Sequence, residues 1–350
     1  MSAEHGVRVA PAPEAPPSAA LDLPDPTAGP SRAAAGPHLL SVADLGAEGI
    51  EEVLRVAGRF VEVNARPIPR VPALRGRTVA TLFFEPSTRT RLSFETAARR
   101  LSADVLTFTA ATSALGKGES LRDTVETVEA LGVDAFVVRH RSSGVPWQVA
   151  RWTRRASVVN GGDGWHEHPT QALLDCYTIR AERQARGHGP SLAGLRVAVV
   201  GDVRHSRVAR SVVLALSALG AGVTLVAPPT LLPPSLTEWP VEVSHDLDAL
   251  LPSLDVAYLL RLQQERMGEA LLPSLREYTA MYGMTGRRAD RLRPAALIMH
   301  PGPVNRGVEL AAEVADRAET VITHQVSNGV AVRMAILYLL LGPGVDLGAL

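Results

Sequence analysis

Short apolar runs alternate with amphipathic stretches along most of this chain, in two successive series. The first series places buried-strand patterns at residues 77–84, 105–108, 134–138 and 157–160. The second series places them at residues 195–200, 222–226, 255–260 and 296–299. Strands that alternate with helices in this way build parallel sheets whose faces are covered by the helices. The sequence therefore predicts an α/β fold with two open parallel sheets.

Helices are expected between the strands of both series. Ser120 and Asp123 resemble a capping box that opens a helix ending near residue 131. A long helix is expected over residues 169–186, with its proline in the first turn, and it joins the two series. Further helices are expected over residues 207–219 and, as the most apolar of all, over residues 329–341.

The first 37 residues differ from the rest of the chain. They hold eight of the 26 prolines, many alanines and no periodic apolar pattern. Such a segment cannot bury enough apolar surface to offset the entropy of ordering it. We therefore expect a disordered tail, with the folded part starting near His38.

The composition restricts the class of protein. Of the 350 residues, 46% are hydrophobic, which is enough for a sizeable core. Lys+Arg and Asp+Glu both number 36, so the net charge of zero argues against nucleic acid or an anionic membrane as a partner. Cys176 is the only cysteine, which excludes a disulfide framework and fits a reducing cytoplasm. The most apolar stretch, residues 334–341, is too short to span a bilayer, and no secretory signal is visible.

A candidate phosphate site follows the first strand. The segment Glu85-Pro86-Ser87-Thr88-Arg89-Thr90-Arg91 leads from that strand into a helix. Ligands of open parallel sheets bind beyond the carboxyl ends of the strands. The free N–H groups of a helix start attract anions, and arginine binds phosphate through two parallel hydrogen bonds. The segment predicts an anion site, the alternative being an ordinary helix cap with surface arginines.

Lys117 is the only lysine of the chain and lies between two glycines in the loop after the second strand. The loop is no phosphate-cradling P-loop, because the glycine spacing is wrong and no Ser or Thr follows the lysine. Arginine is used everywhere else, so a compact ammonium group here suggests a role that a guanidinium cannot fill. A solvated loop with a chance lysine is the alternative.

Polar residues also follow the third and fourth strands. Arg139, His140 and Arg141 come after the third strand, and His166 and His168 precede the linking helix. A His-x-His pair can bind a metal, but no third or fourth ligand has a recognisable spacing. Hydrogen bonding is therefore favoured over a metal site for these histidines.

The strand ends of the second series carry separate arginines. The turn Gly201–Arg207 lacks the G-x-G-x-x-G pattern, so a nicotinamide site is not expected. Arg261-Leu262-Gln263 follows one strand, and the rigid loop His300-Pro301-Gly302-Pro303 follows the last. One half thus offers phosphate chemistry and the other offers cations suited to carboxylates. Together they predict a transferase that joins a phosphorylated donor to an acidic acceptor.

Four segments closely resemble the aspartate carbamoyltransferase catalytic chains of the aspartate/ornithine carbamoyltransferase family. They are Phe84–Arg91, His168-Pro169-Thr170-Gln171, Arg261-Leu262-Gln263 and His300–Arg306. The resemblance runs in order from about His38 to the C-terminus. The first two segments mark carbamoyltransferases in general, and the last two favour the aspartate enzyme.

The resemblance implies the reaction of carbamoyl phosphate with L-aspartate to give N-carbamoyl-L-aspartate and phosphate, in pyrimidine (UMP) biosynthesis. It implies a cytoplasmic homotrimer with shared active sites and no metal or other cofactor, and leaves open a larger assembly with regulatory chains or dihydroorotase. It divides the chain into the tail (1–37), a carbamoyl phosphate-binding domain (38–168), an aspartate-binding domain (169–325) and a C-terminal helix (326–350) that returns to the first domain.

The resemblance assigns residues to each substrate. Those assigned to the phosphate are Ser87, Thr88, Arg89 and Thr90, and Arg89 also stabilises its departure. Those assigned to the carbamoyl group are Thr90, Arg139, His168 and Gln171, the last near the amide. Arg207 is assigned to the α-carboxylate of aspartate, and Arg261 with Gln263 to its side-chain carboxylate. The backbone carbonyls of Pro301 and Gly302 face the transferred amine, and Ser113 and Lys117 come from a neighbouring subunit.

Two alternatives are weighed against this interpretation. Ornithine carbamoyltransferases carry a cysteine-containing His-Cys-Leu-Pro segment where this chain has His300–Pro303, and Arg261 would repel an ornithine ammonium group. A non-catalytic carbamoyltransferase-like subunit would bind ligands without turnover, although the phosphate and carboxylate sets are complete here. A nucleic-acid-binding protein is disfavoured further by the zero net charge.

Overall fold

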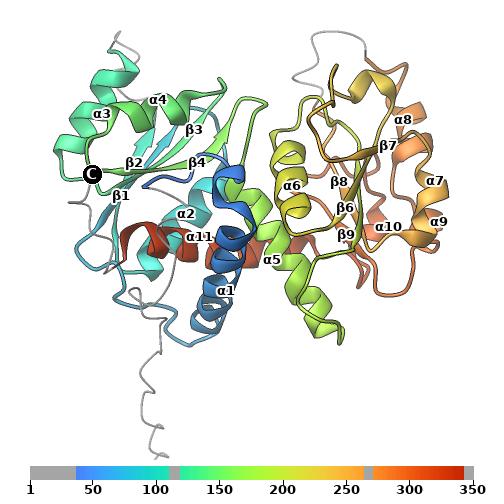
Figure 1. Ribbon diagram of the computed structural model, residues 1–350, viewed down its shortest axis with the longest axis horizontal. Coiled ribbons are helices and arrows are strands. Elements are labelled where there is room, and N and C mark those ends of the chain that lie inside the picture. Colours follow the sequence, from blue (N-terminus) through green and yellow to red (C-terminus); the bar gives the residue numbers. More distant parts are fainter. Residues whose placement is uncertain (1–36, 110–118, 264–270, 343–350) are drawn as a thin grey trace, which may run out of the picture.

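Two separate parallel sheets organise the chain, as the two series of strand patterns predict (Figure 1). The computed structural model describes residues 37–109, 119–263 and 271–342. The sheet with four strands and its helices form the first half of the molecule, and the sheet with five strands and its helices form the second half. The expected tail lies outside the described residues.

The first half is built on four parallel strands in the order β2-β1-β3-β4. The strands are β1 (Thr78–Phe83), β2 (Asp104–Thr109), β3 (Ala135–His140) and β4 (Ser157–Asp163). The helices between them are α2 (Thr88–Arg100), α3 (Leu121–Ala130) and α4 (Val145–Trp152). Alternate residues of β3 belong to two different apolar clusters, one on each face of the sheet. This double burial explains why the strands read as continuous apolar runs.

The second half has five parallel strands in the order β7-β6-β5-β8-β9. The strands are β5 (Arg196–Val200), β6 (Gly222–Val226), β7 (Glu242–Ser244), β8 (Val256–Leu259) and β9 (Leu297–Met299). The α-helices are α6 (Arg207–Ala218), α7 (Leu247–Leu250), α8 (Leu275–Tyr282), α9 (Gly286–Ala289) and α10 (Ala312–Ala315). The 3-10 helices of the chain are η1 (Ala43–Leu45), η4 (Pro229–Leu231) and η5 (Leu251–Ser253).

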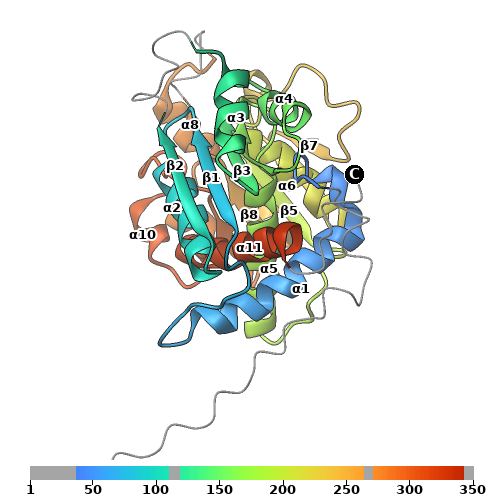
Figure 2. The same ribbon diagram turned by 90° about the vertical axis from the view of Figure 1, so that its left-hand side faces the viewer.

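Two long helices, α5 (Pro169–Ala185) and α11 (Ile322–Leu341), join the halves. Helix α5 links the two sheets, as predicted. Helix α11 packs against α5 and also against α2 and α1 (Gly46–Asn64) of the first half (Figure 2). The expectation that the last helix returns to the first half is therefore confirmed. Its start at Ile322 lies ahead of the predicted start near residue 329, because polar residues occupy its first two turns.

The strand ends determine where a ligand can bind. The carboxyl ends of β1, β3 and β4 and those of β5, β8 and β9 lead into loops that line one cavity between the halves. The Ser120 hydroxyl accepts a hydrogen bond from the Asp123 backbone at the start of α3, so the expected helix cap is present. Within the described ranges, no helix is both long and apolar enough to cross a membrane.

Candidate active site

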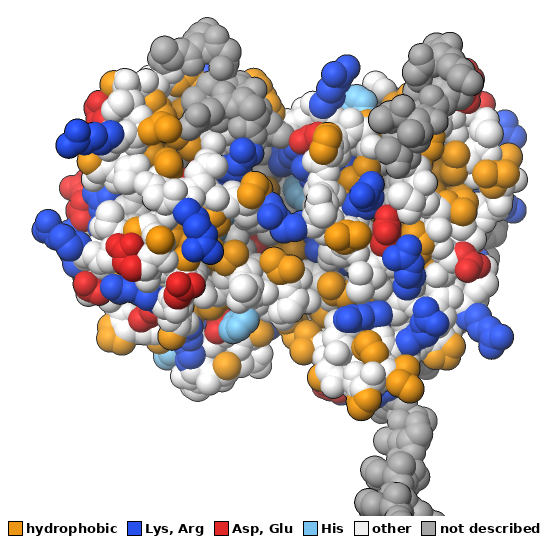
Figure 3. Space-filling model, turned by 180° about the vertical axis from the view of Figure 1, so that it is seen from behind, with side chains coloured by type: hydrophobic (Ala, Val, Ile, Leu, Met, Phe, Trp, Pro, Cys, Tyr) orange, Lys and Arg blue, Asp and Glu red, His pale blue; other side chains and the backbone are white. Residues whose placement is uncertain are grey.

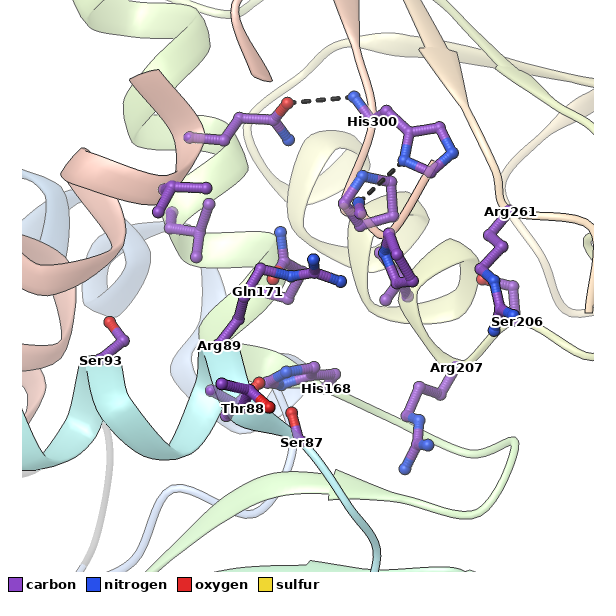
Figure 4. Close-up of a pocket in the computed structure, with 18 of the residues that line it drawn as sticks. Ser87, Thr88, Arg89, Ser93, His168, Gln171, Ser206, Arg207, Arg261 and His300 are labelled. Carbon is purple, nitrogen blue, oxygen red and sulfur yellow. Dashed lines mark hydrogen bonds between the residues drawn. The ribbon is translucent and has the colours of Figure 1, made fainter. Parts of the chain in front are cut away.

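A cavity of about 610 Å³ lies between the two halves, and arginine side chains gather where its walls meet (Figures 3 and 4). Every described residue that the sequence assigns to a substrate lines this cavity. They are Ser87, Thr88, Arg89, Thr90, Arg139, His168, Gln171, Arg207, Arg261, Gln263, Pro301 and Gly302. The two assigned to a neighbouring subunit, Ser113 and Lys117, lie outside the described residues.

The phosphate corner is built by the start of α2. Ser87 is the N-cap residue, but its side chain makes no capping hydrogen bond to the helix. A helix start without a side-chain cap leaves backbone N–H groups and a positive dipole end for an external anion. The hydroxyls of Ser87 and Thr88 and the guanidinium of Arg89 lie beside it (Figure 4).

Arg89 lines the cavity close to another cationic group, Arg261. Burial, and then the charge of Arg261, lower the pKa of Arg89. The guanidinium groups of Arg89 and Arg261 repel one another, so an anion bound between them is favoured. The loop with Gly302 comes close to Arg89, since a Cβ atom at residue 302 would lie 3.1 Å from the Arg89 Cζ atom, and its φ is +64°. Glycine suits both the backbone conformation and the close approach.

Glu85 joins the arginines of the two halves. Both oxygens of its carboxylate accept hydrogen bonds from Arg207 Nη2, at 2.6 and 2.7 Å. Arg139 Nη2 lies 3.5 Å from the same carboxylate, and Arg139 Nη1 donates to the Gly161 carbonyl oxygen at 3.0 Å. A substrate carboxylate that binds Arg207 therefore meets a guanidinium that already has an internal anion. The sequence alone predicts no role for Glu85, although this residue lies just before the phosphate motif.

Two buried histidines face this cationic cavity as neutral groups. Burial, together with the charges of Arg139, Arg333 and Arg207, holds the pKa of His168 well below its usual value. Burial and the charges of Arg89 and Arg261 lower the pKa of His300 to about 3. The Gly302 N–H donates to His300 Nδ1 at 2.8 Å, so the neutral ring carries its proton on Nε2.

A buried carboxyl, Asp175, connects the cavity wall to three elements. Its Oδ1 atom accepts hydrogen bonds from Gln171 Nε2 at 3.1 Å and Gln325 Nε2 at 2.8 Å. Its Oδ2 atom accepts from the Tyr258 hydroxyl at 2.6 Å. Gln325 in turn accepts from the His300 backbone N–H at 3.0 Å (Figure 4). Asp175 thus orients Gln171 and the loop after β9, a role that the sequence argument missed.

A second buried cation, Arg333 of α11, completes the wall. Its Nη1 atom donates to Ser93 Oγ at 2.9 Å and to the Gly329 carbonyl oxygen at 3.1 Å. Burial lowers its pKa to about 10, so it stays charged at neutral pH. Both acceptors are neutral, which leaves its charge to act on the cavity. A lone arginine in the most apolar helix of the sequence was the signal for this residue.

The side chains that line the cavity suit anions as ligands. Among the described residues, no group of three or more His, Cys, Asp or Glu is arranged to hold a metal ion. The arginines, the neutral imidazoles and the start of α2 are donors, placed to bind phosphate and carboxylate groups and to stabilise charge that develops on an oxygen.

Comparisons with protein families agree with this geometry. Residues 37–181 match the carbamoyl-P binding domain of aspartate/ornithine carbamoyltransferases, and residues 193–340 match the Asp/Orn binding domain of the same enzymes. The aspartate carbamoyltransferase catalytic subunit of Nocardioides sp. is 58% identical over 307 residues, which cover 87% of this chain and 94% of that protein. The subunit of the same name from Streptomyces coelicolor is 55% identical over 87% of this chain and 94% of that protein.

Solved structures show the same fold. Aspartate transcarbamoylase from Trypanosoma cruzi, in complex with carbamoyl phosphate and aspartate, superposes with a TM-score of 0.78 and 28% identity, covering 91% of this chain and 98% of that chain. The catalytic subunit of M. jannaschii aspartate transcarbamoylase gives a TM-score of 0.72 and 36% identity, covering 87% and 97%. With both family models matched and more than half of the residues shared with named relatives, the chain belongs to the aspartate/ornithine carbamoyltransferase family.

Proposed function

We propose that this chain is an aspartate carbamoyltransferase, which converts carbamoyl phosphate and L-aspartate into N-carbamoyl-L-aspartate and phosphate. The observation that carries the proposal is that one cavity holds the whole phosphate motif, Ser87–Thr90, opposite Arg207 and Arg261. The first set comes from the first half and the two arginines come from the second. The curated relatives bear the name of this enzyme, and T. cruzi structures hold both substrates.

The donor binds at the start of α2. Its phosphate accepts hydrogen bonds from the hydroxyls of Ser87, Thr88 and Thr90 and from Arg89. Arg139 and His168, with Thr90, donate to the carbamoyl oxygen, and Gln171 accepts from the carbamoyl amide. His168 can donate although it is neutral, because a neutral imidazole carries one N–H.

The acceptor binds on the second half. Arg207 binds the α-carboxylate, while Arg261 and Gln263 bind the side-chain carboxylate. The backbone carbonyl oxygens of Pro301 and Gly302 accept from the amine and orient its lone pair toward the carbamoyl carbon. Bringing two bound reactants together in this way supplies much of the acceleration by removing rotational and translational freedom before the reaction.

The chemical step is an addition followed by an elimination. The amine nitrogen forms a bond to the carbamoyl carbon, and an electron pair moves onto the carbonyl oxygen. When that pair returns, the bond from carbon to the phosphate oxygen breaks, and the phosphate leaves with Arg89 stabilising its charge. We propose that the leaving phosphate takes the proton that the amine gives up. Removal of one donor to such a developing oxyanion costs about 3–4 kcal/mol of barrier.

The setting of the reaction is also a proposal. We infer a cytoplasmic homotrimer that works in pyrimidine biosynthesis, with Ser113 and Lys117 completing the site of a neighbouring copy. The division of the chain at residues 38–168, 169–325 and 326–350 belongs to the same proposal. The family and the separation of the anion sites over two halves support this view.

The test is product formation from carbamoyl phosphate with aspartate and ornithine offered in parallel. We expect carbamoyl aspartate and no citrulline. Citrulline would mean that Arg261 has been assigned to the wrong kind of acceptor. No product from a folded chain that still binds carbamoyl phosphate would favour a non-catalytic subunit.

A further inference from the structure

Trp165 belongs to the first half of the molecule and contacts the second half. It stands on the connection from β4 to α5, and 51% of its surface is exposed. Its ring packs against the ring of His205, which follows β5 in the second half, with centroids 4.9 Å apart and planes at 89°. A large aromatic group left half in solvent makes a specific contact across the two halves.

The turn that carries Trp165 is held rigidly. The buried carboxylate of Asp163 accepts hydrogen bonds from the backbone N–H groups of Gly144 at 2.7 Å and Glu167 at 3.1 Å. It also bonds the side chains of Asn160, at 2.9 Å, and His166, at 3.2 Å. A side chain at Gly164 would collide with Ser143, so the turn is closely packed as well. The indole is therefore presented from a fixed support.

His205 on the other side leads directly to the acceptor site. Its Nδ1 atom donates to the buried carboxylate of Asp202 at 2.8 Å. The Gln263 backbone N–H donates to the other oxygen of Asp202 at 3.2 Å. The Gln263 side-chain amide donates to the His205 carbonyl oxygen at 3.1 Å. Gln263, which lines the cavity as Arg261 does, is thus held by His205 through its side chain and by Asp202, the partner of His205, through its backbone.

We propose that Trp165 is a positioning residue for the acceptor. The inference rests on the proposed function and adds that the rigid turn of the first half orders the His205–Gln263 segment of the second half. The contact of Trp165 leads through His205 to Gln263 on the acceptor side, whereas the phosphate residues Ser87 and Thr88 stand at the start of α2 in the first half. Loss of the indole should therefore weaken acceptor binding and leave donor binding unchanged.

The experiment compares Trp165→Ala, Trp165→Phe and Trp147→Ala in the full-length chain. Trp147 is the matched control, because its ring packs on His166 of the same turn, with centroids 5.0 Å apart, and both residues belong to the first half. Aromatic pairs contribute enough free energy for roughly a three- to tenfold effect. We expect Trp165→Ala to raise the KM for aspartate by that factor, with the KM for carbamoyl phosphate within about twofold of the parent. Trp165→Phe should recover most of the loss, and Trp147→Ala should resemble the parent.

A binding measurement separates this inference from the proposed function. Calorimetric titration of succinate, a dicarboxylate without the reacting amine, into chain saturated with carbamoyl phosphate needs no turnover. Weaker succinate binding in Trp165→Ala alone supports the positioning role even if no product is formed. Equal succinate affinity in Trp165→Ala and the parent, or an equal loss in Trp147→Ala, overturns it. Thermal unfolding of each variant checks that the effect is not a general loss of structure.

Discussion

Several arginines line the cavity, and Arg89 is the one that belongs to the phosphate motif. Its guanidinium lies against the loop with Gly302 and near a second arginine, Arg261. Arg91, two residues along the same helix, lies outside the cavity and is 4.0 Å from Glu95. Arg91 is therefore a suitable control for Arg89, because the two residues have the same side chain and only Arg89 lines the cavity.

Arg89→Ala should abolish catalysis without unfolding the chain. Loss of a donor that stabilises transition-state charge is expected to lower kcat by at least about 100-fold. Arg91→Ala should keep near-parent activity, since surface ion pairs contribute little. Initial rates and thermal unfolding of both variants check this. A kcat for Arg89→Ala close to that of the parent would remove the proposed role.

The two histidines of the His166-x-His168 segment should titrate differently. A hydrogen bond to Asp163 raises the pKa of His166, whereas burial and nearby arginines hold that of His168 well below its usual value. His168 should therefore stay neutral through the physiological range. The stability from this group should be lost as the pH falls below the unfolded value of 6.5, because the unfolded chain then takes up a proton that the folded chain does not. NMR spectra of chain with labelled histidine, assigned with His168→Gln and His166→Gln, give both titrations. Titration of His168 near 6.5 would contradict the assignment.

At the scale of elements, the sequence predicts the buried strands of both sheets and misses one edge strand and one helix. The buried strands are recognisable because both of their faces are covered, and eight of the strand patterns match strands of the structure. The short edge strand β7 is exposed and carries no apolar run, and α1 lies between the expected tail and the first strand pattern, where no helix was assigned. The edge strand is specified by tertiary packing, which a window of sequence does not contain, whereas α1 has apolar residues at helical spacing, Ile50, Val53, Leu54 and Ala57, that could have predicted it.

The residues of the site also differ in how far the sequence reveals them. Residues that touch a substrate lie in short motifs after strands, so Arg89, His168 and Arg261 could be named from the sequence. Residues that hold those groups come from distant elements, and Asp175 is an example, since its partners lie 83 and 150 positions away. No motif encodes such a separation, so only the fold reveals the network.

Asp175→Asn tests that network through its dependence on pH. Burial raises the pKa of Asp175 from 3.8 to about 7, so the folded chain holds an extra proton between these values. The stability from this group is present at low pH and is lost as the pH rises through about 7. Asparagine keeps an oxygen that accepts from the two glutamine amides, and its NH2 group can donate to the Tyr258 oxygen, without titrating. Relative to the parent, the variant should therefore gain stability between about pH 4 and about pH 7.

Asp248→Asn provides a control of opposite sign for that measurement. A hydrogen bond from Arg288 lowers the pKa of Asp248, so its contribution is present above the unfolded value and is lost as the pH falls. This variant should not gain on the parent as the pH rises. Urea unfolding at several pH values gives the free energies for both. If the difference between Asp175→Asn and the parent does not change with pH, Asp175 has an ordinary pKa and the buried network is held differently.

In the whole molecule, each half contributes one anion site to the shared cavity. The first half also exposes apolar side chains to solvent. Leu92 of α2 is 51% exposed and Leu106 of the edge strand β2 is 40% exposed. An unpaired strand edge with apolar side chains beside it is a surface on which another copy can pack. The proposed shared site is consistent with such packing, because Ser113 and Lys117 follow β2 along the sequence.

A mixing experiment tests the shared site. Lys117→Ala and Arg89→Ala should each be inactive alone, because one lacks the group donated to a neighbour and the other lacks the phosphate ligand. In mixed trimers, a complete site forms where Arg89 of a Lys117→Ala chain meets Lys117 of an Arg89→Ala chain. Random assembly from equal amounts makes about a quarter of the sites complete. We expect initial rates near that fraction of the parent after subunit exchange, which differently tagged chains verify. Absence of activity in verified mixed trimers would place both residues in the same subunit's site.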